Sequence, residues 1–306
     1  MPQPRRGLNL LLSATGAAFG AWIASRLIRQ RRLDSDPLYF ADKVVLITGA
    51  SKGIGEALAY ALAARGACLV LAARSEDKLQ AVAAECRSRG APDVLVVPTD
   101  ISEEPALQNL THRALEHFAH VDILINNAGY QRGGALDQVG SEAVYQQITV
   151  NLIGGMLLTQ LLLPDMLARG SGHIVNISSI IGRYAFPYAT SYGASKFGMV
   201  GFNESLRREL YGTGINVTLI NPTFTETDIM SDIKEVVRKS ILRIDSVETV
   251  AQRTLEAIQL NEVEITLDPI MQVSGWLSAI APRLSDLAFR VLTPPGVAEA
   301  AAGQHE

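Results

Sequence analysis

The sequence has 306 residues, enough for one well-buried α/β domain with short appendages and too few for two full domains. Charged residues make up 19% and apolar residues 48%, which excludes an intrinsically disordered chain. Six of the 27 basic residues are arginines within residues 1–33, a stretch without any acid, so the rest of the chain is strongly acidic and nucleic acid is not expected as its main partner.

The N-terminal part of the chain contains a long apolar stretch, Leu8–Ile28. As a helix, it is long enough to span the hydrocarbon core of a bilayer. Arginines flank it on both sides and are more abundant after it, which predicts that the remainder of the chain faces the cytoplasm. We therefore predict that residues 1–33 form a membrane-anchor helix with basic flanks, in contact with lipid through residues 8–28.

Other interpretations of this stretch stay open. A cleaved signal peptide is disfavoured by the arginines that follow the apolar run. A helix lying in the membrane interface would show one clear polar face, and here the apolar residues surround the helix almost completely. A buried helix of the globular body is the least favoured alternative. The sequence does not decide between a spanning and an interfacial helix.

From Asp42 onwards, short apolar runs alternate with longer helical patterns. Because the runs are continuously apolar, they are typical of parallel strands buried on both faces. Right-handed crossovers then predict a single doubly wound parallel sheet, a Rossmann fold with helices on both faces, over residues 42–267. The expected strands are 44–47, 69–72, 94–97, 123–125, 173–177, 215–220 and 263–266; the expected helices are 53–64, 75–89, 103–118, 141–167, 190–211 and 247–259.

A glycine-rich turn, residues 48–55, lies between the first strand and the first helix. Glycines there let the turn close tightly and let backbone amides approach a pyrophosphate, which the helix N-terminus also attracts. The turn predicts a dinucleotide site whose contacts come from Gly49, Ser51, Lys52, Gly53, Ile54 and Gly55. The two cysteines, Cys68 and Cys86, predict neither a disulfide framework nor a metal site.

The end of the second strand bears on which dinucleotide binds. A site that prefers an unphosphorylated ribose usually has an acid at this position, whereas the sequence reads Ala72-Ala73-Arg74. The guanidinium of Arg74 suits a phosphate, and Lys52 adds a second positive charge nearby. These residues predict NADP(H) rather than NAD(H), although Arg74 could also be an ordinary surface residue.

Together these motifs resemble the short-chain dehydrogenase/reductase family, in its single-domain Rossmann branch, over about residues 42–267. The order and spacing that carry the resemblance are 48–55, Asp100, Asn126-Asn127-Ala128-Gly129, Asn151, Ser179 and Tyr192-Gly193-Ala194-Ser195-Lys196. The resemblance implies that Asp100 contacts the adenine, that Lys196 holds the nicotinamide ribose, and that further cofactor contacts come from Asn127, Ala128, Gly129, Pro222 and Thr227.

Tyr192 and Lys196 are four residues apart on an expected helix and therefore share one face. A phenol has a pKa near 10, and a neighbouring ammonium favours the phenolate and lowers that pKa. Tyr192 could then act as a general acid or base on a carbonyl or alcohol oxygen. By itself such a pair is more often a plain helix surface, and only the surrounding motifs give it a catalytic meaning.

Two further residues complete the expected catalytic group. Ser179 follows the fifth strand, at the sheet edge where such folds bind ligands, and its hydroxyl could bind the substrate oxygen. Ser178 is adjacent, and its spacing to Tyr192 resembles the family less well. Asn151 lies in an expected helix, where asparagine is mildly unfavourable. The resemblance implies that it orders a water linked to Lys196.

The sequence departs from the family pattern after the sixth strand, where Pro222-Thr223 replaces the common Pro-Gly. Threonine restricts φ, so a slightly different seating of the cofactor is expected, without loss of function. The aromatic residues between Ser179 and Tyr192, namely Tyr184, Phe186 and Tyr188, are expected either to wall the substrate pocket or to pack as ordinary loop residues.

Residues 268–306 form an expected helical tail beyond the resemblance. Its apolar residues recur at helical spacing, with Pro282 as an interruption: Trp276, Ile280, Leu284, Leu287 and Val291. This stripe could dock against the body or a second subunit, touch a membrane surface, or cover an apolar substrate. The oligomeric state, including a homo-oligomer, is left open.

The leading hypothesis is an NADP(H)-dependent oxidoreductase that interconverts a lipophilic ketone or aldehyde with its alcohol, tethered to a membrane by a single N-terminal anchor. An NAD-linked alcohol dehydrogenase of the same fold is the enzymatic alternative. A dinucleotide-binding regulatory protein without turnover is the alternative from another class, although such proteins usually lose the tyrosine or the lysine. The substrate and the favoured direction are left undecided.

Overall fold

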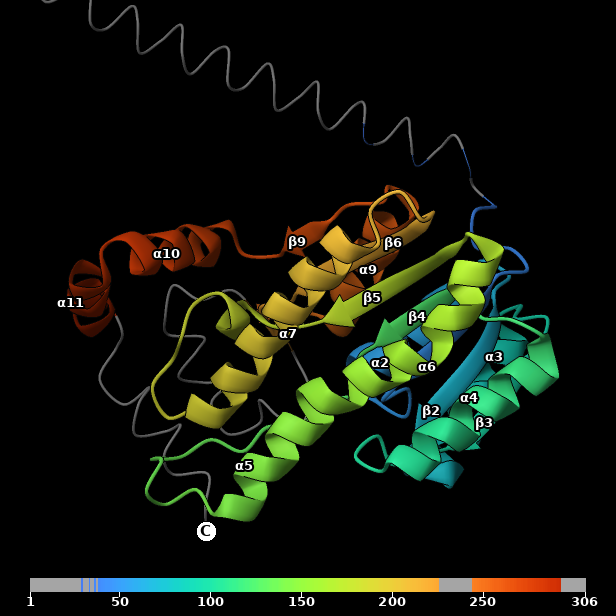
Figure 1. Cartoon of the computed structure of the whole chain (residues 1–306), viewed down its shortest axis with the longest axis horizontal. Coiled ribbons are helices and arrows are strands. Elements are labelled where there is room, and N and C mark those ends of the chain that lie inside the picture. Colours follow the sequence, from blue (N-terminus) through green and yellow to red (C-terminus); the bar gives the residue numbers. More distant parts are fainter. Residues whose placement is uncertain (1–28, 30–32, 34–35, 37, 226–243, 293–306) are drawn as a thin grey trace, which may run out of the picture. The chain divides into compact units, whose positions relative to one another are not determined.

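The computed structural model describes residues 29, 33, 36, 38–225 and 244–292 (Figure 1). The chain divides into two compact units, Met1–Tyr39 and Phe40–Glu306. The expected anchor helix, residues 8–28, lies outside the described residues, as do Thr227 and the end of the tail from residue 293.

The second unit is built on a seven-stranded sheet in the order β3-β2-β1-β4-β5-β6-β9, with every neighbouring pair parallel. The strands are runs of aliphatic and β-branched residues, buried on both faces because helices cover both. The predicted doubly wound α/β fold is confirmed. The strands are β1 (Val44–Thr48), β2 (Cys68–Ala73), β3 (Val94–Pro98), β4 (Ile123–Asn126), β5 (Gly172–Ile177), β6 (Ile215–Asn221) and β9 (Glu264–Thr266).

Helices cover the two faces of this sheet in two groups. Residues of α4, α6 and α7 join the apolar core that packs on one face of the central strands. Helices α2, α3 and α9 pack together in the other group, with α2 against both α3 and α9. The helices are α2 (Gly53–Ala63), α3 (Glu76–Ser88), α4 (Glu104–Phe118), α5 (Ser141–Ile148), α6 (Gly154–Arg169), α7 (Thr190–Glu209), α9 (Val247–Gln259), α10 (Pro269–Ile280) and α11 (Pro282–Leu292).

The helix expected over 141–167 differs in one respect from the prediction. A π-helical turn, η1 (Thr149–Ile153), separates α5 from α6 and carries Asn151. Among the described residues, the continuous helical stretch Ser141–Arg169 alone is long and apolar enough to cross a membrane by length and composition. It packs against α4, α7 and β5, as expected for a core helix of an α/β domain.

The tail forms two helices, α10 and α11, which meet where the sequence analysis expected the interruption, at Pro282. One side of α11 docks on the body: Ser285 is buried, and the Phe289 ring lies 6.2 Å from that of Tyr184 and 5.6 Å from that of Phe186. The expected apolar stripe lies on the exposed side, with exposed fractions of 62% for Trp276 and 84% for Ile280.

Candidate active site

The strand order reverses direction between β1 and β4, which is the point where open parallel sheets bind ligands. A cleft of about 1240 Å³ lies there, at the carboxyl ends of the strands. Most of the residues expected from the sequence line it. They are Gly49, Ser51, Lys52, Gly53, Ile54, Arg74, Asp100, Asn127, Ala128, Gly129, Ser179, Tyr192, Lys196 and Pro222. Gly55 and Asn151 do not line the cleft: Gly55 packs against the carbonyl of Gly49, and Asn151 lines a small separate cavity.

The glycine turn requires glycine for two reasons. Gly49 has φ of 67°, and a Cβ added to it would lie 2.9 Å from the Cα of Ala128. Gly55 lets α2 pack directly against the carbonyl oxygen of Gly49. Lys52 is the N-cap of α2, and its side chain makes no capping hydrogen bond. The start of α2 therefore presents backbone amides and its dipole to the cleft, which fits a pyrophosphate.

Thr48 is a site residue that the sequence analysis did not single out. Its hydroxyl oxygen accepts hydrogen bonds from the backbone N–H groups of Asn127 and Ala128, each at 3.0 Å. The side chain of Asn127 in turn donates to the carbonyl of Thr48 at 2.9 Å. These bonds join the ends of β1 and β4. In the sequence, Thr48 is recognisable only as the first residue of the glycine-rich turn.

Positive side chains line the cleft at the start of α2, just after β2 and in the first turn of α3. Arg74 is exposed there, and Lys52 and Lys78 also line the cleft. Asp100 accepts two hydrogen bonds from Ser102, from the backbone N–H at 2.9 Å and the hydroxyl at 2.6 Å. Burial opposes ionisation of Asp100, but these bonds and the charge of Arg74 outweigh it and lower its pKa. An ionised Asp100 therefore lies within the field of Arg74.

Tyr192 and Lys196 lie on the first part of α7 and both line the cleft. The Lys196 ammonium donates to the carbonyl of Ile177 at 3.0 Å and lies 5.7 Å from the centre of the Tyr192 ring. Burial raises the pKa of Tyr192 to about 12, although its hydrogen bond with Ser179 acts in the opposite direction. Burial also lowers the pKa of Lys196 to about 8.

The expectation that Lys196 lowers the pKa of Tyr192 is therefore not met in this structure. The physical reason is that desolvation disfavours both charged forms, and the ammonium is bonded to a backbone carbonyl rather than to the phenol. With its pKa raised, Tyr192 holds its proton at neutral pH.

The two adjacent serines have different surroundings. Ser179 is hydrogen-bonded to Tyr192, and its oxygen also accepts from the backbone N–H of Ile181 at 3.1 Å, where it caps the short 3₁₀ turn η2 (Ile180–Gly182). The hydroxyl of Ser178 instead donates to the backbone carbonyl of Lys196 at 3.1 Å. Ser178 is thus engaged with the backbone of α7, whereas Ser179 acts on the pKa of the Tyr192 phenol.

Asn151 is buried in the π turn, and its side chain braces two neighbours. Its amide nitrogen donates to the carbonyl of Tyr130 at 2.8 Å and to the hydroxyl of Ser195 at 3.0 Å. Its oxygen accepts from the backbone N–H of Tyr130 at 2.7 Å. Asn151 therefore connects the turn after β4 to α7. Its contact on α7 is Ser195, which lies between Tyr192 and Lys196 in the sequence.

The Pro222-Thr223 step leads into a small parallel pair, β7 (Phe224–Thr225) and β8 (Ile244–Asp245), which the sequence analysis did not expect. Thr223 is buried, and its hydroxyl donates to the carboxylate of Asp245 at 3.2 Å. The threonine that replaces the common glycine thus has a specific partner in the second strand of this pair.

An aromatic cluster backs the wall of the cleft next to Tyr192. Phe224 lines the cleft and packs edge-on against Phe186, with ring centres 5.9 Å apart. Phe186 in turn contacts Phe289 of α11. Of the loop aromatics named from the sequence, Tyr184 and Phe186 join this apolar cluster, so the tail supports the wall from outside.

Comparisons with known proteins agree with this architecture. Residues 43–237 match a family model described as short chain dehydrogenase. The chain is 35% identical to "11-beta-hydroxysteroid dehydrogenase A" from Sesamum indicum, over 85% of this chain and 78% of that protein. It is 34% identical to "Dehydrogenase/reductase SDR family protein 7-like" from Anopheles gambiae, over 84% and 85% of the two chains. It is 33% identical to "Ketoacyl reductase HetN" from a Nostoc species, over 75% of this chain and 80% of that protein.

Proposed function

The chain belongs to the short-chain dehydrogenase/reductase family of oxidoreductases, which use a nicotinamide dinucleotide and act on CH–OH groups, and from this premise we propose that it is an NADP(H)-dependent carbonyl reductase for a lipophilic ketone or aldehyde. The observation that carries the proposal is that Ser179, Tyr192 and Lys196 line the same cleft as the glycine turn.

The proposed mechanism divides the work between cofactor and protein. A nicotinamide dinucleotide, when bound, supplies the hydride in one direction and accepts it in the other. Tyr192 holds its proton at neutral pH, because burial raises its pKa, and can donate it to the substrate oxygen as the carbonyl is reduced. Ser179, hydrogen-bonded to the same phenol, would orient that oxygen. Lys196 would hold the ribose hydroxyls.

The preference for NADP(H) rests on charge at the end of β2. Arg74 is exposed on the cleft wall, and Lys52 and Lys78 line the same cleft. Together they favour a phosphate on the adenosine ribose, because the carboxylate that would bind a free 2′-hydroxyl is missing at this strand end. NAD(H) is the alternative cofactor.

A lipophilic substrate is favoured by the apolar wall around Tyr192, which the aromatic cluster of Phe186, Phe224 and Phe289 supports. One relative carries a hydroxysteroid dehydrogenase name and another a ketoacyl reductase name, both of which denote oxidoreductions at a carbon that bears oxygen. The apolar stretch 8–28 and the exposed tail stripe would place such a site at a membrane, where apolar carbonyl compounds accumulate.

The decisive experiment uses the full chain and a panel of apolar carbonyl compounds: a steroid ketone, retinal, hexadecanal and nitrobenzaldehyde. Tyr192→Phe removes the proton donor and keeps the ring packing, so we expect reduction to fall by at least about 10²-fold. Binding of NADPH, followed by its fluorescence, should change little.

Tyr211→Phe is the matched control, because the Tyr211 side chain is 90% exposed and does not line the cleft. It should behave like the wild type. Sustained turnover by Tyr192→Phe would remove Tyr192 from its role, and a wild type inactive on every panel compound with both cofactors would count against the carbonyl-reductase proposal itself.

A further inference from the structure

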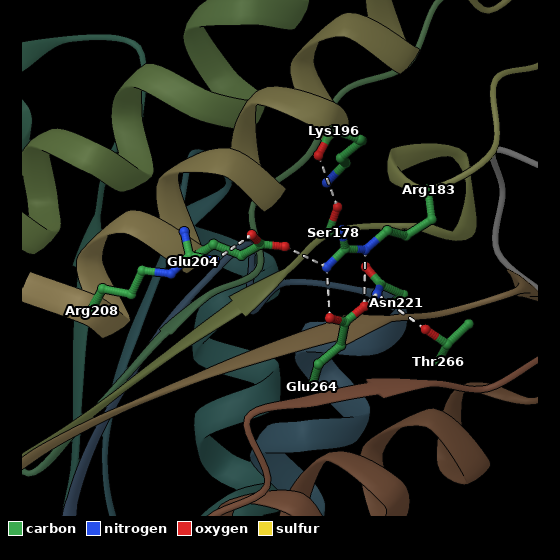
Figure 2. Close-up of polar contacts among 8 residues, drawn as sticks. All are labelled: Ser178, Arg183, Lys196, Glu204, Arg208, Asn221, Glu264 and Thr266. Carbon is green, nitrogen blue, oxygen red and sulfur yellow. Dashed lines mark hydrogen bonds and ion pairs between the residues drawn. The ribbon is translucent and has the colours of Figure 1, made fainter. Parts of the chain in front are cut away.

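The loop that follows β5 presses closely on α7 at the position of Lys196. The hydroxyl of Ser178 donates to the backbone carbonyl of Lys196 (Figure 2). A Cβ on Gly182 would lie 2.9 Å from the same carbonyl oxygen, so this contact tolerates no side chain. The loop that carries Ser179 therefore packs in close contact with α7, the helix that carries Tyr192 and Lys196.

Arg183 is the next residue of this loop, and its guanidinium contacts two carboxylates, those of Glu204 and Glu264 (Figure 2). Its guanidinium holds the Glu264 carboxylate with two hydrogen bonds, from Nε at 3.0 Å and from Nη2 at 2.6 Å. Nη2 also donates to Oε1 of Glu204 at 2.9 Å. Glu204 lies on α7, two turns after Lys196, and Glu264 begins β9. Arg183 thus joins the serine loop to the catalytic helix and to the sheet.

The same cluster reaches the cofactor side of the cleft. Asn221, the last residue of β6, donates to Oε1 of Glu264 at 2.8 Å and to the Thr266 hydroxyl at 3.2 Å. It precedes Pro222, whose carbonyl accepts from the backbone N–H of Ile180 at 3.0 Å. A hydrogen bond therefore joins the turn at Pro222, which is expected to contact the nicotinamide, directly to the loop that carries Ser179. Glu264 joins the same two segments a second time, because it contacts both Asn221 and Arg183.

We propose that Arg183 is a positioning residue, whose bridge between Glu204 and Glu264 sets the placement of Ser179 relative to Tyr192 and Lys196. This inference rests on the proposed function and adds a residue to the same site. Arg183 does not line the cleft and touches none of the reacting groups, so its effect passes through the loop backbone. A misplacement of reacting groups by about 1 Å can cost about 10²-fold in rate, whereas it leaves the distant phosphate contacts intact.

A plain stabilising ion pair is the competing explanation. The side chains of Arg183, Glu204 and Glu264 are 30%, 34% and 25% exposed, and partly exposed ion pairs usually contribute little to the free energy of unfolding. The two explanations differ in their readouts, since a stabilising role would lower the melting temperature at unchanged kcat, and a positioning role would lower kcat in a folded protein that still binds NADPH.

The test compares Arg183→Ala, Glu204→Gln and Arg208→Ala in the full chain, with the panel carbonyl that the wild type reduces fastest. We expect Arg183→Ala to lower kcat by about tenfold or more, with less change in KM and an NADPH affinity within about twofold of the wild type. Glu204→Gln should lower kcat in the same direction. Arg208→Ala is the matched control, because Arg208 contacts the other oxygen of Glu204 at 3.4 Å and is 67% exposed.

Chemical rescue adds a readout that a merely structural role would not move. Millimolar guanidinium chloride, far below denaturing concentrations, should restore a measurable part of kcat in Arg183→Ala, because the guanidinium ion can occupy the partly exposed space between the two carboxylates. Sodium chloride at equal ionic strength should not. Arg183→Lys, which cannot hold Glu264 with two parallel bonds, should remain impaired.

The inference is overturned if Arg183→Ala keeps the wild-type kcat, or if its only defect is a lower melting temperature. It is also overturned if the guanidinium and sodium salts act alike. Failure of the proposed function looks different: the wild type would then reduce no panel carbonyl, or Tyr192→Phe would still reduce one. If Tyr192→Phe does not reduce the panel carbonyl and Arg183→Ala keeps the wild-type kcat, only the role of Arg183 is rejected.

Discussion

At the scale of single residues, the pKa values of Tyr192 and Lys196 would govern the pH range in which the proposed reaction proceeds. Burial raises the pKa of Tyr192 to about 12 and lowers that of Lys196 to about 8. Near neutral pH the phenol therefore carries the proton that carbonyl reduction consumes, while the ammonium is still largely charged. Both groups are therefore in the protonation state that the proposed reduction would require.

This arrangement predicts the pH dependence of the reaction. We expect kcat/KM for carbonyl reduction to fall as pH rises through about 8, because Lys196 loses its positive charge there. No further loss from Tyr192 is expected until the pH approaches 12. Steady-state rates with NADPH between pH 6 and 10 measure this profile. A rate that increases across this range would contradict the assignment.

Arg74 is the residue whose substitution should alter cofactor preference. Arg74→Ala removes the guanidinium from the exposed rim of the cleft and should weaken NADPH by about tenfold or more, while NADH is nearly unaffected. Titration of both cofactors measures the ratio of dissociation constants. Arg113→Ala, on the exposed side of α4 and away from the cleft, is the control. Equal effects of Arg74→Ala on both cofactors would reject a phosphate contact.

At the scale of secondary-structure elements, α10 meets the catalytic loop at a glycine. A Cβ on Gly275 would lie 2.6 Å from the carbonyl oxygen of Arg183, so α10 can approach the loop this closely only with glycine at that position. The adjoining α11 then brings Phe289 against Tyr184 and Phe186. The docking of the tail and the aromatic wall therefore depend on one close contact.

Gly275→Ala should consequently destabilise the protein by about 1–3 kcal/mol, because the added methyl group pushes α10 away from the loop. Thermal or urea unfolding measures this change. Gly201→Ala is the matched control: Gly201 is an exposed residue of α7 with nothing near an added Cβ, and alanine should stabilise that helix by up to about 1 kcal/mol. Effects of the same sign in both variants would contradict the packing argument.

At the scale of the whole molecule, the acidic α/β unit follows an arginine-flanked apolar segment in the sequence. We expect residues 1–33, fused to a soluble reporter protein, to carry it into membranes that resist extraction with high salt. Replacing Leu10, Leu11 and Leu12 with serine should weaken this association, because each substitution removes apolar area from lipid. A wild-type fusion recovered in the soluble fraction would reject the anchor.

Much of this architecture could be predicted from local patterns. Each expected strand of the sheet was found, because the seven strands are short apolar runs between helices and need no distant information. The glycine turn was likewise recognisable, since its residues are contiguous. The π turn around Asn151 was not predictable, because periodicity does not distinguish an α-helix from one with a single inserted residue.

By itself the sequence determined the fold class and the family, and most of the site residues that it predicted do line the cleft, because these depend on periodicity and on motifs of fixed spacing. Only the tertiary structure revealed that burial raises the pKa of Tyr192 and that Arg183 bridges α7 and β9. Those properties depend on desolvation and on contacts between residues far apart in the chain, and neither is encoded in any local pattern.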